Sequence, residues 1–125
     1  MSQSFYDQEM PASIIEEGGE SMNPWAVFVF PKTSPVFSGH FPGNPVLPAV
    51  IQMPAVRLVA ERALGRPLLP KSQERSRFTN VVRPEEKLRI GLVINPEGDD
   101  FRVEFSLRCN DEAVARGEIV YKEGE

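Results

Sequence analysis

Cysteine and histidine are almost absent from this sequence. Cys109 is its only cysteine and His40 its only histidine. No disulfide bond can therefore form within the chain, and the residues that usually hold zinc cannot gather into a cluster. We expect neither a metal site nor a bound cofactor.

The sequence also lacks an excess of basic residues and a long apolar run. Its 14 Lys and Arg are scattered among 18 Asp and Glu, for a formal net charge of -4, which argues against a nucleic acid partner. No apolar run reaches the roughly 18 residues of a membrane span, and the N-terminal residues MSQSFYDQEM do not resemble a secretory leader. We expect a cytoplasmic protein without a membrane span.

The length of the chain fits one hydrophobic core. It has 125 residues, of which 41% are hydrophobic, and a chain of this size rarely builds two cores. We therefore predict a single domain over residues 1–125, with fraying of about residues 1–10 and 123–125.

Three segments near the C-terminus alternate between apolar and polar residues. Apolar or small residues recur at every second position in 88–94, 101–107 and 113–121, which is typical of half-buried strands. Turn-forming residues fill the connections, NPEGDD at 95–100 and NDE at 110–112. The pattern predicts an antiparallel meander.

A further strand is expected at residues 25–30, because WAVFVF is apolar on both faces. Such a strand suits a position between the core and a second subunit. We expect it to pair with a preceding strand, around residues 12–17, across a break at Gly18-Gly19.

A helix is predicted at residues 48–64 (PAVIQMPAVRLVAERAL), with Gly65 as its C-cap and Pro67 as a stop. Its first turns are apolar nearly all round, so they should be buried. The fold class is therefore α+β, with an antiparallel sheet wrapped round one long central helix.

The loop before this helix carries the candidate chemistry. Residues 37–50 read FSGHFPGNPVLPAV, and so many prolines restrict the loop and hold His40 in place. The first N–H groups of a helix lack intrahelical partners and can polarise a carbonyl group. An imidazole, which ordinarily titrates near roughly pH 6.5, is a suitable base beside them.

Two stretches resemble the FabZ and FabA type 3-hydroxyacyl-[acyl-carrier-protein] dehydratases. GHFPGNPVLPAV, at 39–50, is similar to the family signature GHFPGxPVxPGV, and RFTNVVRPEEKL, at 77–88, is similar to RFxxPVxPGDxL. With the matching order of elements, the resemblance covers about residues 12–121. It implies the hot-dog fold and an enzyme of fatty acid or polyketide-type lipid synthesis.

The resemblance also assigns roles to residues. It implies that His40 is the catalytic base and that the backbone amides of Ala49 and Val50 face the thioester carbonyl. Ala49 replaces the family's glycine and is expected to narrow the approach of the substrate. The acyl chain would lie in a tunnel between two subunits, with the remaining substrate-binding positions at Phe41, Gly43 and Phe78.

The resemblance fails at one position. The family's second catalytic group is a carboxylate on the central helix, 14 residues after the histidine, where this chain has Pro54. General acid catalysis by such a group is typically worth about 10²–10⁴-fold. Nearby Gln52 is not acidic, and Glu61 lies two turns further on and is expected to be too far away.

Several functions therefore remain open. The chain is a dehydratase that uses His40 with water or another acid, or half of a heterodimer whose partner supplies the carboxylate. Alternatively, it is a non-catalytic subunit that binds acyl thioesters. An acyl thioesterase is a further alternative, although Pro54 counts against it too.

The expected partners follow from the same resemblance. They are thioesters of acyl carrier protein or coenzyme A, together with a second subunit in a homodimer or heterodimer, or in a higher oligomer. Acyl carrier proteins are acidic, so docking is expected on the most basic part of the chain, residues 57–77, and above all on Arg75 and Arg77.

Overall fold

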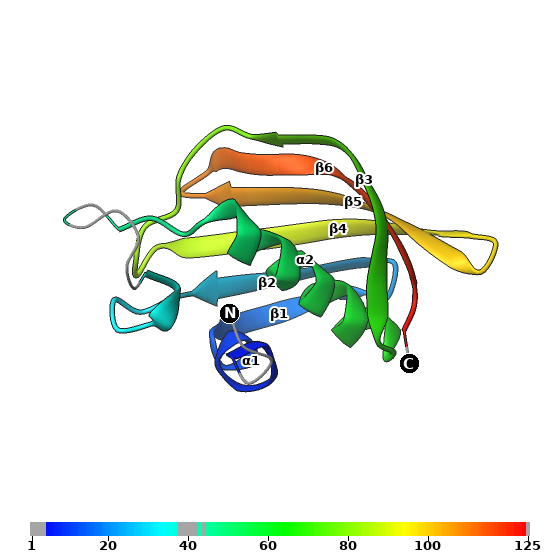
Figure 1. Cartoon of the computed structure of the whole chain (residues 1–125), viewed down its shortest axis with the longest axis horizontal. Coiled ribbons are helices and arrows are strands. Elements are labelled where there is room, and N and C mark those ends of the chain that lie inside the picture. The colour runs from blue at the N-terminus through cyan, green and yellow to red at the C-terminus, as the bar shows by residue number, and fades with distance from the viewer. Residues whose placement is uncertain (1–4, 38–42, 44, 125) are drawn as a thin grey trace.

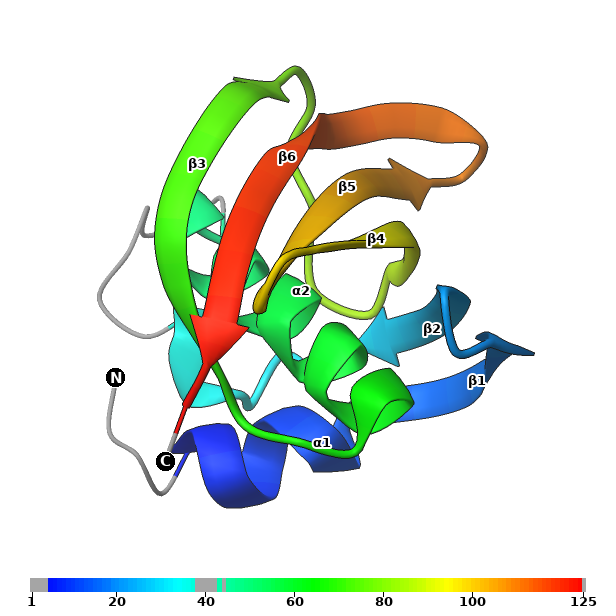
Figure 2. The same cartoon turned by 90° about the vertical axis from the view of Figure 1, so that its right-hand side faces the viewer.

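The computed structural model describes residues 5–37, 43 and 45–124. Its strands are β1 (Ile14–Glu20), β2 (Asn23–Val29), β3 (Leu68–Phe78), β4 (Lys87–Glu97), β5 (Asp100–Cys109) and β6 (Glu112–Glu123). All the strands of the described residues form one six-stranded antiparallel sheet in the order β1-β2-β4-β5-β6-β3. The sheet curls round one long helix, α2 (Ala49–Leu64), which confirms the predicted architecture (Figures 1 and 2).

The predicted meander is formed by β4, β5 and β6. The turn between β4 and β5 consists of Gly98 and Asp99, since Glu97 pairs with Asp100. It is shorter than the predicted connection at 95–100, because both strands continue beyond their apolar residues. Asn110 and Asp111 form the second turn with positive φ angles of 53° and 65°, a conformation that Asn and Asp tolerate better than most residues.

The first hairpin differs from the prediction. Gly18 and Gly19 do not break the strand: both belong to β1, and the turn to β2 follows at Ser21 and Met22. The two glycines are required by Trp25, which pairs with Gly18 across the hairpin. A Cβ atom at Gly18 would lie 2.7 Å from Cζ2 of the Trp25 ring.

Helix α2 matches the predicted boundaries within one residue. Pro48 is the N-cap in an extended conformation, and Gly65 is a left-handed C-cap with φ 67° whose N–H donates to the Glu61 carbonyl at 2.8 Å. The helix is continuous through Pro54.

One side of the helix packs against the concave face of the sheet and buries Ile51, Ala55 and Val56. The prediction that its first turns are buried nearly all round is wrong at Ala49 and Val50, which are exposed because the sheet covers the helix from one side.

Strand β3 was not predicted as a strand. Its sequence, LLPKSQERSRF, is exposed along nearly all its length, because β3 lies at the edge of the sheet and pairs with β6 alone. Register irregularities fall between Pro70 and Ser72 and between Glu74 and Arg77. A polar strand at an edge shows no clear alternation, and proline is tolerated there.

Both ends of the described chain contact the rest of the fold. Residues Phe5–Glu9 form a π-helical turn that leads into the short helix α1 (Met10–Ala12), and Met10 is buried in the core. At the other end β6 extends to Glu123, and the Gly124 N–H donates to the Pro67 carbonyl at 2.9 Å.

The core lies between α2 and the sheet. It is built from one face of every central strand and from the buried side of α2, with Phe28 and Phe30 stacked at 5.8 Å between ring centroids. Cys109 is part of this core, and burial raises the pKa of its thiol. No helix in the described segments is long and apolar enough to cross a membrane.

Candidate active site

The start of α2 is open to solvent. Ala49 and Val50 are exposed, and the Val50 side chain has 72% relative exposure. The N–H groups of Ile51 and Gln52 donate to the Pro48 carbonyl, whereas those of Ala49 and Val50 have no acceptor among residues 5–37, 43 and 45–124. Within the described residues, these two N–H groups at the positive end of the helix dipole are thus not committed to another acceptor.

Leu47 fixes the segment that leads into α2. Its N–H donates to the Val82 carbonyl at 2.7 Å, and its carbonyl accepts a 3.2 Å hydrogen bond from Nε2 of Gln52. The first bond ties this segment to the chain that follows β3, at one end of the sheet (Figure 1), and the second ties it to α2. The approach to the helix is therefore held from both sides.

Gln52 is the buried polar residue of this region. Only 3% of its surface is exposed, and its Oε1 has no hydrogen-bond partner within the described part of the chain. A buried acceptor without a donor usually costs about 1–3 kcal/mol. Gln52 therefore positions Leu47 through its Nε2, while its Oε1 is left without a donor among the described residues.

Apolar side chains are exposed around this end of the sheet. Phe78, at the end of β3, is 41% exposed, and Val81 is exposed three residues later. Val50 adds a third exposed apolar side chain at the start of α2. Exposed apolar side chains gathered at one end of a sheet suggest a surface that another molecule covers.

The acid of α2 has a structural role. Glu61 is the only acidic residue between Ala49 and Leu64. Its Oε1 accepts a 2.6 Å hydrogen bond from the Tyr6 hydroxyl, and its Oε2 accepts a 2.8 Å bond from the Leu68 N–H. Both carboxylate oxygens are thus occupied at the far half of the helix, away from Ala49.

Comparison with known proteins shows which family the chain belongs to. Residues 19–118 match the model of the ApeI-like family, described as ApeI dehydratase. The chain belongs to the ApeI-like dehydratase family. The dehydratase family that the two sequence motifs indicated is therefore confirmed.

Relatives named 3-hydroxyacyl-[acyl-carrier-protein] dehydratase FabZ share about a third of the matched residues. The Moorella thermoacetica protein is 35% identical over 97 residues, covering 71% of this chain and 68% of its own length. The Caldicellulosiruptor saccharolyticus protein is 30% identical over 115 residues, covering 86% and 80%. The match to a Caulobacter vibrioides protein, 30% identical, spans 60% of that protein's length and 68% of this chain.

Solved structures support the fold. A chain of the dehydratase heterocomplex ApeI:P from Xenorhabdus doucetiae superimposes with a TM-score of 0.74 and 22% identity, over 87% of this chain and 96% of that one. A hypothetical thioesterase with coenzyme A from Streptococcus pneumoniae gives a TM-score of 0.71 at 4% identity, over 98% and 97%. At such identities the likeness shows a shared hot-dog fold and nothing about the reaction.

Some of the site residues predicted for this ApeI-like protein lie within the described residues and others do not. His40 and Phe41 lie outside the described residues, so their roles stay predictions. Gly43 is described, and its φ of 81° is a conformation that glycine adopts without strain. Pro54 lies half-buried in the second turn of α2, and no group of three or more metal-binding side chains occurs in the described residues.

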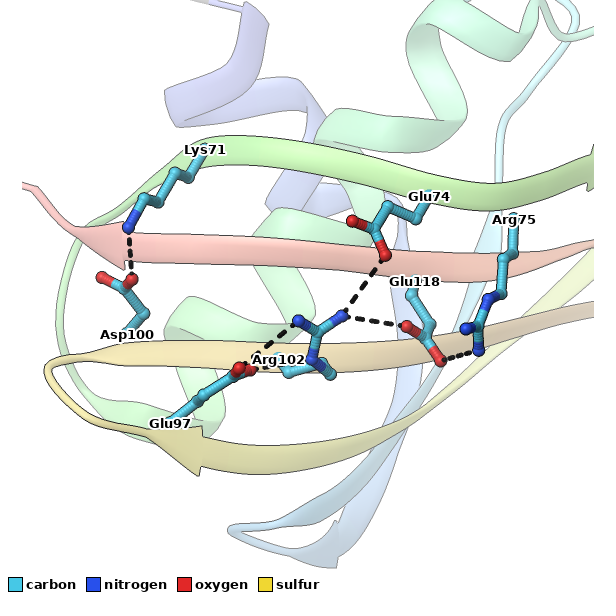
Figure 3. A network of polar contacts seen from close by, with 7 residues as sticks. All are labelled: Lys71, Glu74, Arg75, Glu97, Asp100, Arg102 and Glu118. Carbon is cyan, nitrogen blue, oxygen red and sulfur yellow. Dashed lines mark hydrogen bonds and ion pairs between the residues drawn. The ribbon is translucent and has the colours of Figure 1, made fainter.

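The basic residues predicted for carrier docking are dispersed. Of the residues from Arg57 to Arg77, five already have partners: Arg57 stacks on the Tyr6 ring, and the ion pairs are Arg62–Glu17, Arg66–Glu123, Lys71–Asp100 and Arg75–Glu118. Figure 3 shows the last two pairs on the outside of the sheet. Arg77 alone has no ion pair or hydrogen bond from its side chain to any described residue.

The sequence alone did not point to two residues that matter for the candidate site and its surroundings. The first is Tyr6, in the segment expected to be frayed, which occupies Glu61. The second is Arg116, whose position beside Arg77 depends on the pairing of β3 with β6. Neither has a local sequence signal, because each arises from contacts between distant parts of the chain.

Proposed function

We propose that this chain is the histidine-bearing subunit of a 3-hydroxyacyl-thioester dehydratase whose acid comes from a second, related hot-dog subunit. In this reaction His40 removes a proton from C2, and the C3 hydroxyl leaves as water with a proton from the acid. The product is a 2-enoyl thioester. The N–H groups of Ala49 and Val50 would stabilise the charge that develops on the thioester oxygen.

The observation that carries this proposal is the state of the acids on α2. Pro54 replaces the carboxylate of the family, and Glu61 is held by Tyr6 and Leu68 through both oxygens. A homodimer of this chain therefore has a base and carbonyl-binding groups at the helix start but no free helix carboxylate. A partner that supplies this group would complete the site.

The shape of the sheet supports a second subunit. β3 is an edge strand with one unpaired side, and Val50, Phe78 and Val81 expose apolar surface at the same end of the molecule. The Xenorhabdus doucetiae chain that shares this fold comes from a dehydratase heterocomplex. We infer an analogous pairing of two hot-dog subunits here, with the acyl chain in a tunnel lined by Phe41 and Phe78.

A non-catalytic role is the second candidate, and Pro54 is the observation that favours it. A subunit without the acid could still bind acyl thioesters of acyl carrier protein or coenzyme A. In that case the loop around His40 and Gly43 would build the tunnel of an active partner. The two candidates differ in whether His40 takes part in the reaction.

The deciding experiment is intact-mass spectrometry of a 3-hydroxyacyl carrier protein incubated with this chain and watched for loss of water. The chain is assayed alone and with a related hot-dog subunit that retains the carboxylate, and each assay is repeated with His40→Ala. We expect water loss that needs both subunits and that falls at least about 100-fold with His40→Ala. Full activity of the complex containing His40→Ala would instead establish the non-catalytic role.

A further inference from the structure

A groove crosses the face of the sheet turned away from α2. In four adjacent strands the buried residues Ala26, Ile90, Leu107 and Ala115 pair with one another on the α2 side. The next row of paired residues therefore faces outward. That row runs from β2 to β3 through Trp25, Gly91, Ser106, Arg116 and Arg77.

The small residues in this row make the groove. Gly91 has no side chain and Ser106 a short one, so the outer surface is hollow between Trp25 at one end and Arg116 at the other. The resulting groove has a volume of about 950 Å³. It is a feature of sheet register, because residues from five strands line it.

The groove is basic although the protein is acidic. Four arginines (Arg75, Arg77, Arg89 and Arg116) and two glutamates (Glu104 and Glu118) line it, in a chain of net charge -4. Glu118 is already neutralised, since it pairs with Arg102 at 3.1 Å and with Arg75 at 3.5 Å (Figure 3).

Arg77 and Arg116 stand out within this groove. They are direct cross-strand neighbours, and neither guanidinium has an ion pair or hydrogen bond to any residue that the structure describes. Like charges directly opposite each other destabilise a sheet. The charge pairing is therefore unfavourable for the folded protein alone, and an external anion would relieve the repulsion.

The spacing of the charges favours a protein over a small anion. The Arg89 guanidinium lies 4.4 Å from the centre of the Trp25 ring. Arg89 is two strands from β6 and two residues along β4 from the row of Arg116. At about 4.8 Å per strand and 3.3 Å per residue, the backbones of Arg89 and Arg116 are roughly 12 Å apart. Cationic groups at the two ends of a groove suit a partner that carries several carboxylates better than one small anion. Carboxylates on successive turns of an acidic helix, about 5–6 Å apart, can contact both ends of the groove.

From these features we infer that the outer-face groove, centred on Arg77 and Arg116, is the docking surface for the acidic acyl carrier protein that presents the thioester. The inference rests on the proposed function for the identity of the partner. It narrows the predicted docking site from the basic region of residues 57–77 to this one groove. Arg77 also adjoins Phe78, at the end of the sheet where the proposed tunnel lies.

Trp25 provides the measurement, because it is the only tryptophan in the chain and it lines the groove. The apo form of an acyl carrier protein, which has no acyl group to react, is titrated into the full chain while tryptophan fluorescence is followed. If the carrier itself contains tryptophan, a tryptophan-free variant of it is used. The full chain is studied with its partner subunit where one is required.

We expect saturable binding that weakens steeply with added salt. Charge reversal of both residues, Arg77→Glu with Arg116→Glu, should weaken binding by about tenfold or more. Arg66→Glu is the matched control, because Arg66 belongs to the basic region at the end of α2 but lies outside the groove. This control should bind the carrier with unchanged affinity.

Three results would overturn the inference. They are no carrier binding by the unsubstituted protein, equal affinity after the double charge reversal, and an equal loss with Arg66→Glu. Tighter binding of free coenzyme A than of the carrier, with the same fluorescence change, would also overturn it and assign the groove to a nucleotide.

Failure of docking can be separated from failure of the proposed function. A 3-hydroxyacyl N-acetylcysteamine thioester carries no protein, so its dehydration should be unaffected by the charge reversals. Salt-sensitive carrier binding without any dehydration would leave the docking surface intact and refute the catalytic role.

Discussion

The hydroxyl of Tyr6 donates a 2.6 Å hydrogen bond to Oε1 of Glu61 and accepts a 3.2 Å bond from Nε of Arg57. The Arg57 guanidinium also lies 4.4 Å from the centre of the Tyr6 ring. Through these contacts the N-terminal turn is fastened to the second half of α2. The bond from Tyr6 also occupies one oxygen of Glu61, the only carboxylate of the helix.

Removal of the Tyr6 hydroxyl should destabilise the protein. We expect Tyr6→Phe to lower the free energy of unfolding by roughly 1–2 kcal/mol, because the hydrogen bond to a carboxylate is lost while the ring stays. Urea denaturation measures this change. Tyr121→Phe is the control, because the Tyr121 hydroxyl makes no hydrogen bond to a described residue. If it lowered the free energy of unfolding as much as Tyr6→Phe does, the stabilising role of the Tyr6 hydrogen bond would be contradicted.

Stability should also fall at alkaline pH. Burial, and then the hydrogen bond to Glu61, raise the pKa of Tyr6 above its ordinary value of 10.0, and burial raises the pKa of Tyr121 in the same direction. Unfolded tyrosines therefore lose their protons first, so stability present below about pH 10 is lost as the pH rises further, by at most about 1.4 kcal/mol per pH unit for each tyrosine.

Urea midpoints between pH 8 and pH 11 measure this dependence. These two are the only tyrosines in the chain, so Tyr6→Phe should reduce the slope and the double variant with Tyr121→Phe should reduce it further. An unchanged slope in the double variant would mean that other groups cause the alkaline loss.

The glycines of the first hairpin should be intolerant of a side chain. Gly19 has a φ of 87°, and a Cβ atom there would collide with the Asn23 carbonyl oxygen and approach Trp25. Gly98 has a similar φ of 64° but open space around it. We expect Gly19→Ala to cost about 2 kcal/mol more than Gly98→Ala, as measured by urea denaturation, with a shift in Trp25 fluorescence. Equal costs would show that the hairpin yields easily.

These comparisons indicate what the sequence could reveal. The meander and α2 were predictable because their apolar residues follow the periods of a half-buried strand and of a buried helix. β3 was not, since LLPKSQERSRF is exposed along nearly all its length. Gly18-Gly19 suggested a turn, but those glycines make room for Trp25, a residue that is distant in sequence until the strands pair.

The candidate site was predictable to a different extent. The motif around His40 and the missing carboxylate at Pro54 are local features of the sequence, so they could be read directly. The occupation of Glu61 by Tyr6 and the pairing of Arg77 with Arg116 could not, because each requires the register or packing of segments about 40 or 55 residues apart. Long-range contacts of this kind leave no periodic trace.

Restoring the acid is the most direct test of the incomplete site. Pro54→Glu returns a carboxylate to the family's position and also gives α2 the N–H that proline lacks. If the chain forms the composite sites of a homodimer, dehydration of a 3-hydroxyacyl thioester should then rise by about 10²–10⁴-fold without any partner subunit. Intact-mass spectrometry of the thioester measures the gain.

Pro54→Gln separates the chemical effect from the backbone effect. It restores the same N–H with a side chain of nearly the same shape, but it cannot donate a proton as an acid. The gain should therefore appear with Pro54→Glu, be absent with Pro54→Gln, and disappear when His40→Ala is added to Pro54→Glu. Equal gains for the two substitutions would instead mean that proline limits the reaction through the geometry of α2, and the site would then need no carboxylate from a second subunit.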